Sequence, residues 1–175
     1  MADTPDGIEL GRHRDYPWTL RDSLARYGVL LAVGALLALG LASFFGQRER
    51  TDVAVGPSAQ LEVSAPTRVR GGLFFQGRFR IRAMRLIRHA TLVLDPGWQE
   101  QLSINTIEPS PIGEASRDGR LALDFGALHP GDTVVARIQF QVNPAQFFAR
   151  RSQDVELADG ERRLLSVERT LTVFP

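Results

Sequence analysis

The chain has 175 residues, with 21 basic and 20 acidic side chains, a net charge of +1 and no cysteine. This near-neutral balance provides no overall field that would attract nucleic acid. The lack of cysteine excludes disulfides, thiolate nucleophiles, thiolate zinc sites and lipid attachment to cysteine.

The first predicted element is a transmembrane helix over residues 27–46, an uncharged apolar run of spanning length. Residues 1–26 form a charged tail whose end is expected to begin the helix at the membrane interface, with Trp18 and Tyr27 as aromatic interface residues. More arginines precede the run than closely follow it. The bias predicts a single-pass protein of the inner (plasma) membrane with a cytoplasmic N-terminus and an extracytoplasmic C-terminal domain.

A cleaved signal peptide is the alternative for this run. Gly40, Leu41 and Ala42 place small residues at the spacing that signal peptidase accepts, just before Ser43. We favour a retained helix, because the charged segment before the run is long for a signal peptide and the run itself reaches spanning length.

Small residues recur every fourth position along the predicted helix. They are Gly34, Ala38, Ala42 and Gly46. This spacing lays one ridge along a single helix face, which allows a second helix to approach closely. The pattern predicts a helix-packing face, although small residues are also common in any transmembrane helix.

Residues 47–57 are polar, end at Gly-Pro and are expected to be a linker, and residues 58–175 are expected to be the β domain. That domain shows short alternating or apolar segments separated by turn residues. The expected strands are residues 60–64, 73–83, 90–94, 102–107, 121–125, 133–142, 155–158 and 162–173. Asp95-Pro96-Gly97 is expected to form a type II turn, and Asp159-Gly160 a hairpin turn. Seven or eight strands with no long helical period predict a mainly β chain, an immunoglobulin-like antiparallel β-sandwich preceded by one transmembrane helix.

One segment resembles a known family. Residues 125–135, FGALHPGDTVV, followed by Ile138, Phe140, Val142 and Pro144, are similar to a corner of bacterial immunoglobulin-like surface modules of the adhesion-related and NEW3-like groups. In those modules the corner joins two sheets, so the resemblance implies a fold and an extracytoplasmic location, without a site. Such modules usually occur in tandem, whereas this chain has one copy after an anchor.

Two groups of residues are predicted to form interaction surfaces. Seven arginines and no acidic residue fall between Thr67 and His89. The candidate interface residues are Arg78, Arg80, Arg82, Phe147, Phe148, Arg150 and Arg151. The arginines are expected to face anionic lipid headgroups or an acidic partner, the alternative being a solvated face paired with neighbouring carboxylates. The phenylalanine pair is expected in an exposed loop, the alternative being a plug at the end of the sandwich.

No catalytic, cofactor or metal site is predicted. His13, His89 and His129 are isolated in the sequence, and Ser64, Ser103 and Ser166 have no glycine-flanked elbow. Asp95 and Glu100 could form an acid pair, but surface carboxylates are the commoner interpretation. The sequence therefore favours a protein that is not an enzyme, with the lipid bilayer and other membrane subunits as partners and no nucleic acid.

Two functions are consistent with these patterns. The first is a noncatalytic accessory or scaffolding subunit that stabilises or assembles a larger membrane complex, such as an energy-transducing, respiratory or photosynthetic assembly. The alternative is a free-standing envelope module that binds a glycan, a lipid headgroup or a protein. A glycan groove would need exposed tryptophan or tyrosine, and Trp98 is the only such residue in the predicted domain.

Overall fold

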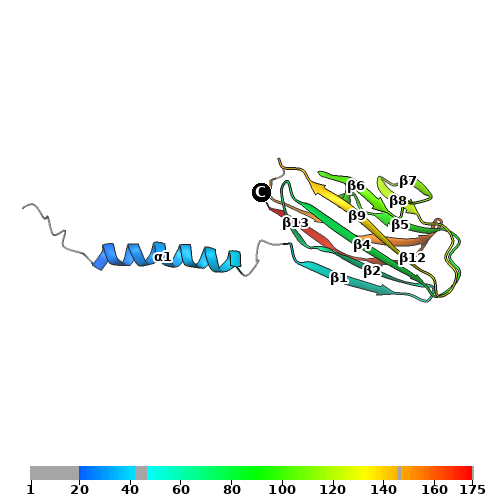
Figure 1. The fold of residues 1–175 in the computed structure, drawn as a ribbon, viewed down its shortest axis with the longest axis horizontal. Coiled ribbons are helices and arrows are strands. Elements are labelled where there is room, and N and C mark those ends of the chain that lie inside the picture. Colours follow the sequence, from blue (N-terminus) through cyan, green and yellow to red (C-terminus); the bar gives the residue numbers. More distant parts are fainter. Residues whose placement is uncertain (1–19, 42–46, 146, 175) are drawn as a thin grey trace, which may run out of the picture. The chain divides into compact units, whose positions relative to one another are not determined.

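The computed structural model describes residues 20–41, 47–145 and 147–174 (Figure 1). Within them the chain forms one helix, α1 (Leu20–Leu41), and a β domain, which are two separate compact units. Trp18, Ala42 and Gly46, for which roles were predicted, lie outside the described residues. No residue of the window Ser23–Leu41 is buried, and its mean hydropathy is 2.0, so α1 is long and apolar enough to span a membrane.

The first sheet of the β domain has five antiparallel strands in the order β1-β2-β4-β9-β6. They are β1 (Glu49–Val55), β2 (Ala59–Pro66), β4 (Phe74–Ala83), β9 (Thr133–Val142) and β6 (Leu102–Glu108). Along β4 exposed and buried residues alternate strictly, as expected for a strand with one face on a core and one in solvent.

A second sheet also has five antiparallel strands, in the order β12-β11-β5-β8-β7, and a third has three, in the order β10-β13-β3. The second contains β12 (Arg162–Val167), β11 (Val155–Asp159), β5 (Ala90–Leu94), β8 (Arg120–Asp124) and β7 (Gly113–Arg117). The third contains β10 (Ala149–Ser152), β13 (Thr170–Phe174) and β3 (Arg68–Arg70), with β13 and β3 parallel.

All three sheets contribute to one hydrophobic core. Trp98 is the largest fully buried side chain in it among the described residues. Its ring meets Phe79 edge-on, with ring centroids 5.2 Å apart, and lies 5.1 Å from Phe140. Its indole N–H donates to the carbonyl of Gln153 at 3.0 Å, so the polar part of this buried ring is satisfied. The prediction of a mainly β chain with antiparallel sheets and one N-terminal apolar helix is therefore confirmed.

The structure differs from the predicted elements at several places. The short strands β3, β7 and β10 were not among the expected strands. The segment 47–57, expected to be a linker, contains β1, whose charged residues suit an edge strand. The expected strand 162–173 is two strands in different sheets, β12 and β13, which part at Arg169. Pro96–Trp98 forms a 3-10 turn in place of the type II turn, and Gly97 is required there because a Cβ would lie 1.9 Å from the carbonyl oxygen of Ser152.

Candidate functional site: an arginine face and a polar groove

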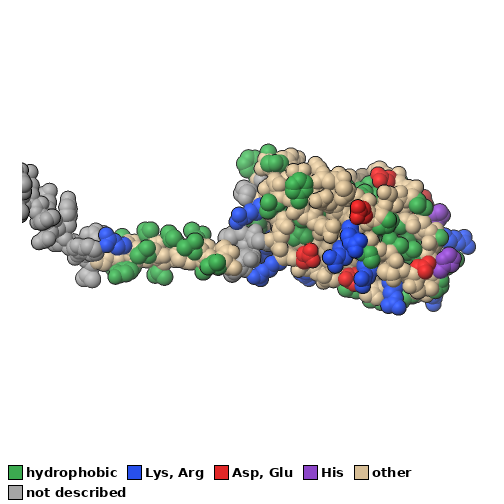
Figure 2. All heavy atoms as spheres, viewed as in Figure 1, with side chains coloured by type: hydrophobic (Ala, Val, Ile, Leu, Met, Phe, Trp, Pro, Cys, Tyr) green, Lys and Arg blue, Asp and Glu red, His purple; other side chains and the backbone are tan. Residues whose placement is uncertain are grey.

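The outer face of the first sheet carries a group of exposed arginines. Arg78, Arg80 and Arg82 point outward from β4 because each alternates with a buried residue. Arg137 of β9 lies directly opposite Arg78 in the register and is also exposed. We call Arg78, Arg80, Arg82 and Arg137 the arginine face. In Figure 2 basic side chains gather over β4 on this side of the domain.

Two of the four arginines have a carboxylate opposite them on a neighbouring strand. Glu108 of β6 is the register neighbour of Arg137, and Glu62 of β2 is the register neighbour of Arg80. Within the described residues, however, none of the four arginines forms an ion pair within 4.0 Å. Like charges directly opposite one another on a sheet are unfavourable, as with Arg78 and Arg137. The four arginines thus lie beside Glu62 and Glu108 without forming an ion pair to them, and they outnumber these two carboxylates, so the face can attract an anionic partner.

The predicted phenylalanine pair lies elsewhere, on the loop before β10. Phe147 is 82% exposed and Phe148 is 64% exposed, so neither fills the end of the domain as a plug. The ring of Phe148 rests edge-on against Phe174, with centroids 5.7 Å apart. Arg150 is exposed, whereas the next residue, Arg151, is half-buried and donates to the carbonyl of Glu100. Adjacent strand residues face opposite ways, which separates the two arginines.

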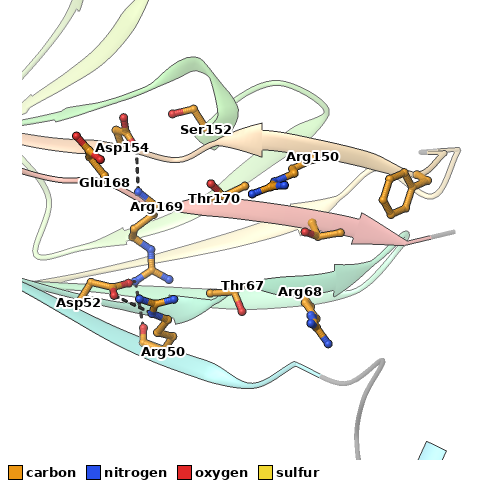
Figure 3. A pocket seen from close by; sticks show the side chains of 12 residues that line it. Arg50, Asp52, Thr67, Arg68, Arg150, Ser152, Asp154, Glu168, Arg169 and Thr170 are labelled. Carbon is orange, nitrogen blue, oxygen red and sulfur yellow. Dashed lines mark hydrogen bonds and ion pairs between the residues drawn. The ribbon is translucent and has the colours of Figure 1, made fainter. Parts of the chain in front are cut away.

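A groove of about 840 Å³ runs along the third sheet (Figure 3). Arg68 and Arg150 flank Thr172 on neighbouring strands of its floor. The remaining lining residues are mainly polar: Arg50, Asp52, Thr67, Phe148, Ser152, Asp154, Glu168, Arg169 and Thr170. The sequence analysis did not identify this groove, because its residues come from four separate segments of the chain.

Arg169 closes one side of the groove and joins the first sheet to the third. Its side chain is 1% exposed and reaches the Asp52 carboxylate, with Nη1 2.8 Å from Oδ2. Nη1 also donates to the carbonyls of Arg50 at 3.1 Å and Val63 at 2.8 Å, and Nη2 donates to that of Ala65 at 2.7 Å. Burial lowers the pKa of Arg169 from its ordinary value of 12.5, and Asp52 opposes this shift.

The candidate catalytic residues are exposed or take part in structural contacts. His89 is not isolated: its Nδ1 lies 3.2 Å from Asp124 Oδ2 at the edge of a hollow of about 620 Å³. Among the described residues, however, no serine hydroxyl lies within hydrogen-bonding distance of His89. Asp95 accepts from the Ser152 hydroxyl at 3.1 Å, and Ser64 pairs with Thr51 at 2.8 Å. Within the same part of the chain, no group of three or more His, Asp or Glu residues could hold a metal ion.

No protein-family model matches the chain, and no curated protein matches it either. Among solved structures, similarity is found to the Pseudomonas fluorescens alkylpurine DNA glycosylase AlkC bound to DNA containing an abasic site analog. That match has 14% identity and a TM-score of 0.31, and covers 91% of this chain and 40% of the glycosylase. The chain thus spans less than half the length of that enzyme. A TM-score this low does not indicate a shared fold.

Proposed function

We propose that this chain is a noncatalytic, single-pass protein of the inner (plasma) membrane. Its N-terminus lies in the cytoplasm, and its extracytoplasmic β domain serves as an accessory or scaffolding subunit of a larger membrane complex. The observation that carries the proposal is the arginine face, four exposed guanidinium groups without an ion pair in the described part of the chain. Such a surface favours an acidic protein partner, because complementary charge steers and orients association.

We infer further that the domain is an immunoglobulin-like sandwich. Two five-stranded sheets contribute their buried faces to one core, as in such domains. The segment that resembles bacterial surface modules runs from the end of β8, in the second sheet, to β9, in the first. Its turn uses Gly131 at φ 96°, a conformation that suits glycine. This placement is consistent with a corner joining two sheets.

The docking role of the arginine face can be tested by photocrosslinking in native membranes. A photoreactive phenylalanine analogue at position 80 is expected to give a discrete crosslinked product. The change Arg78→Gln with Arg82→Gln should reduce its yield about tenfold, which corresponds to about 1.4 kcal/mol of lost affinity. The reason is that both changes remove charge beside the crosslinking position without touching the core.

The matched control removes the same charge elsewhere, by Arg85→Gln with Arg88→Gln, since both residues are exposed outside the arginine face. It should leave the yield unchanged, and the analogue at Ala115, on exposed β7, should give no such product. Equal yields from the two double variants would contradict the proposal. A mature protein beginning at Ser43 would contradict the anchor.

A further inference from the structure

The chain enters the β domain at the end that carries most of its exposed aromatic side chains. The Gln47 side-chain amide donates to the carbonyl of Phe74 at 3.0 Å, which places the first described residue of the domain beside the start of β4. Backbone hydrogen bonds join Gly72 to Val142 and Gly71 to Phe174. Residues 71–74, the loop after β9 and the end of β13 therefore meet at this one end of the domain.

Four large apolar side chains are exposed there. Leu73 is 45%, Phe74 52%, Phe148 64% and Phe147 82% exposed. Every phenylalanine that is mostly exposed in the described part of the chain belongs to this group, whereas Phe75, Phe79 and Phe140 are buried. The other large apolar side chains exposed among the domain's described residues are not aromatic and lie elsewhere: Val53, Val55, Met84, Leu86 and Ile112. Exposed aromatic side chains concentrated at one end mark a surface that binds something apolar.

Basic residues surround these apolar side chains. Arg68 and Arg70 of β3 and Arg150 of β10 are exposed, and the three strands of that sheet contain no acidic residue. In Figure 2 hydrophobic and basic side chains lie at the end of the domain where the C mark stands in Figure 1. We call Arg68, Arg70, Leu73, Phe74, Phe147, Phe148 and Arg150 the anchor-end surface. Exposed apolar side chains surrounded by arginines match the interface of an anionic bilayer. There the apolar side chains can contact the acyl chains while the guanidinium groups bind the headgroup phosphates.

The length of chain outside the domain favours a bilayer as the occupant. Five residues, all uncharged, separate Leu41 at the end of α1 from Gln47. Fully extended, this stretch reaches about 20 Å, at roughly 3.3–3.6 Å per residue. The apolar run itself continues to Gly46. If α1 is the anchor proposed above, Gln47 emerges at the membrane surface, and so does the end of the domain to which it is bonded.

We propose that the anchor-end surface docks on an anionic phospholipid bilayer, with the phenylalanine tips at the level of the acyl-chain boundary and the arginines among the headgroup phosphates. This inference rests on the anchor in the proposed function but not on the arginine face. Docking holds the domain against the membrane in one orientation, which leaves the long strands of the first sheet and their arginines accessible from the side.

The absence of cysteine allows a clean test in the full-length protein reconstituted into vesicles. An environment-sensitive NBD label is attached to Ala145→Cys, next to the phenylalanine pair, or to His129→Cys. Position 129 lies beyond the far end of the ten-residue β4, about 30 Å away at roughly 3.3 Å per residue. The vesicles are phosphatidylcholine alone or an equal mixture with phosphatidylglycerol, each with and without acyl-chain-brominated lipid.

We expect brominated lipid to quench the label at 145 several-fold more than the label at 129, and more strongly in the phosphatidylglycerol mixture. Phe147→Ser with Phe148→Ser should reduce quenching at 145 to the level at 129. Arg68→Gln with Arg150→Gln should remove its dependence on phosphatidylglycerol, whereas Arg85→Gln with Arg88→Gln should not.

Equal, weak quenching at both positions in a protein that resists carbonate extraction would overturn docking and leave the anchor intact. Release of the protein by carbonate would overturn the anchor as well. A label at 145 that is shielded in native membranes but not in vesicles would show that the occupant is a protein, and would also overturn the proposal.

Discussion

Replacing Arg169 with methionine is expected to reduce the free energy of unfolding by about 3–5 kcal/mol, the usual cost of removing one partner from a buried charged network. Methionine fills much of the space but donates no hydrogen bond. The carbonyls of Val63 and Ala65, both fully buried residues, would lose their guanidinium donors. The measurement is urea unfolding of the full-length protein in mild detergent, followed by far-ultraviolet circular dichroism.

Two further variants separate the contacts of Arg169. Asp52→Asn should cost somewhat less, about 2–3 kcal/mol, because the amide oxygen can still accept from Nη1 although the buried guanidinium loses its counter-charge. Arg169→Lys should fall between these values, since an ammonium group cannot span the separate acceptors of a planar guanidinium. Arg85→Met, at an exposed position, is the control and should change stability by less than about 0.5 kcal/mol. A similar, small loss in Arg169→Met and Arg85→Met would show that the buried network does not stabilise the domain.

Replacing Trp98 with alanine should also destabilise the domain by about 3–5 kcal/mol, as for other large buried aromatic residues. The substitution opens a cavity between Phe79 and Phe140 and removes the donor to the Gln153 carbonyl. Trp98→Phe should cost less, about 1–3 kcal/mol, mainly from the unsatisfied carbonyl. The same unfolding experiment applies.

Phe147→Ala is the matched control for Trp98, because it removes an aromatic ring that is 82% exposed. In detergent it should leave the unfolding midpoint nearly unchanged. If Trp98→Ala were as mild as this control, Trp98 would have to be a surface residue. An exposed Trp98 would support the alternative function, an envelope module that binds a glycan. The burial of Trp98 disfavours that function.

The sequence predicted the strands whose two faces differ most. Along β4 and β9 apolar residues alternate with polar ones, and the expected range of β9, residues 133–142, agrees with the structure. The buried strand β5 was recognisable as a short apolar run bounded by turn residues. In these elements the local sequence pattern and the final environment agree, so the pattern alone located them.

Long-range contacts explain what the sequence did not reveal. β1 contains Arg50 and Asp52, which the sequence analysis assigned to a linker because they are charged. In the folded domain both bind Arg169, which lies more than a hundred positions later in the chain. Arg169 itself falls within the strand expected over residues 162–173, and no neighbouring residue in the chain indicates that its side chain is buried. Trp98 follows a Pro-Gly pair that is typical of an exposed turn, yet the 3-10 turn directs it into the core. The arginine face was predictable in composition, but its lack of ion pairs depends on side-chain geometry between strands.

The position of β1 has a mechanical consequence. β1 is the first strand after α1, and it pairs with β2 through seven antiparallel residue pairs that begin at Glu49, the residue nearest the helix. A tensile force drawing Gln47 away from the domain along the strand axis shears all seven pairs together and cannot peel them apart one by one. Arg169 donates hydrogen bonds to the carbonyl of Arg50 and the carboxylate of Asp52, both close in sequence to Gln47, where the force acts. The domain should therefore resist a pulling force applied at Gln47. Removing the Arg169 contacts, as in Arg169→Met, should lower the force at which β1 separates from β2.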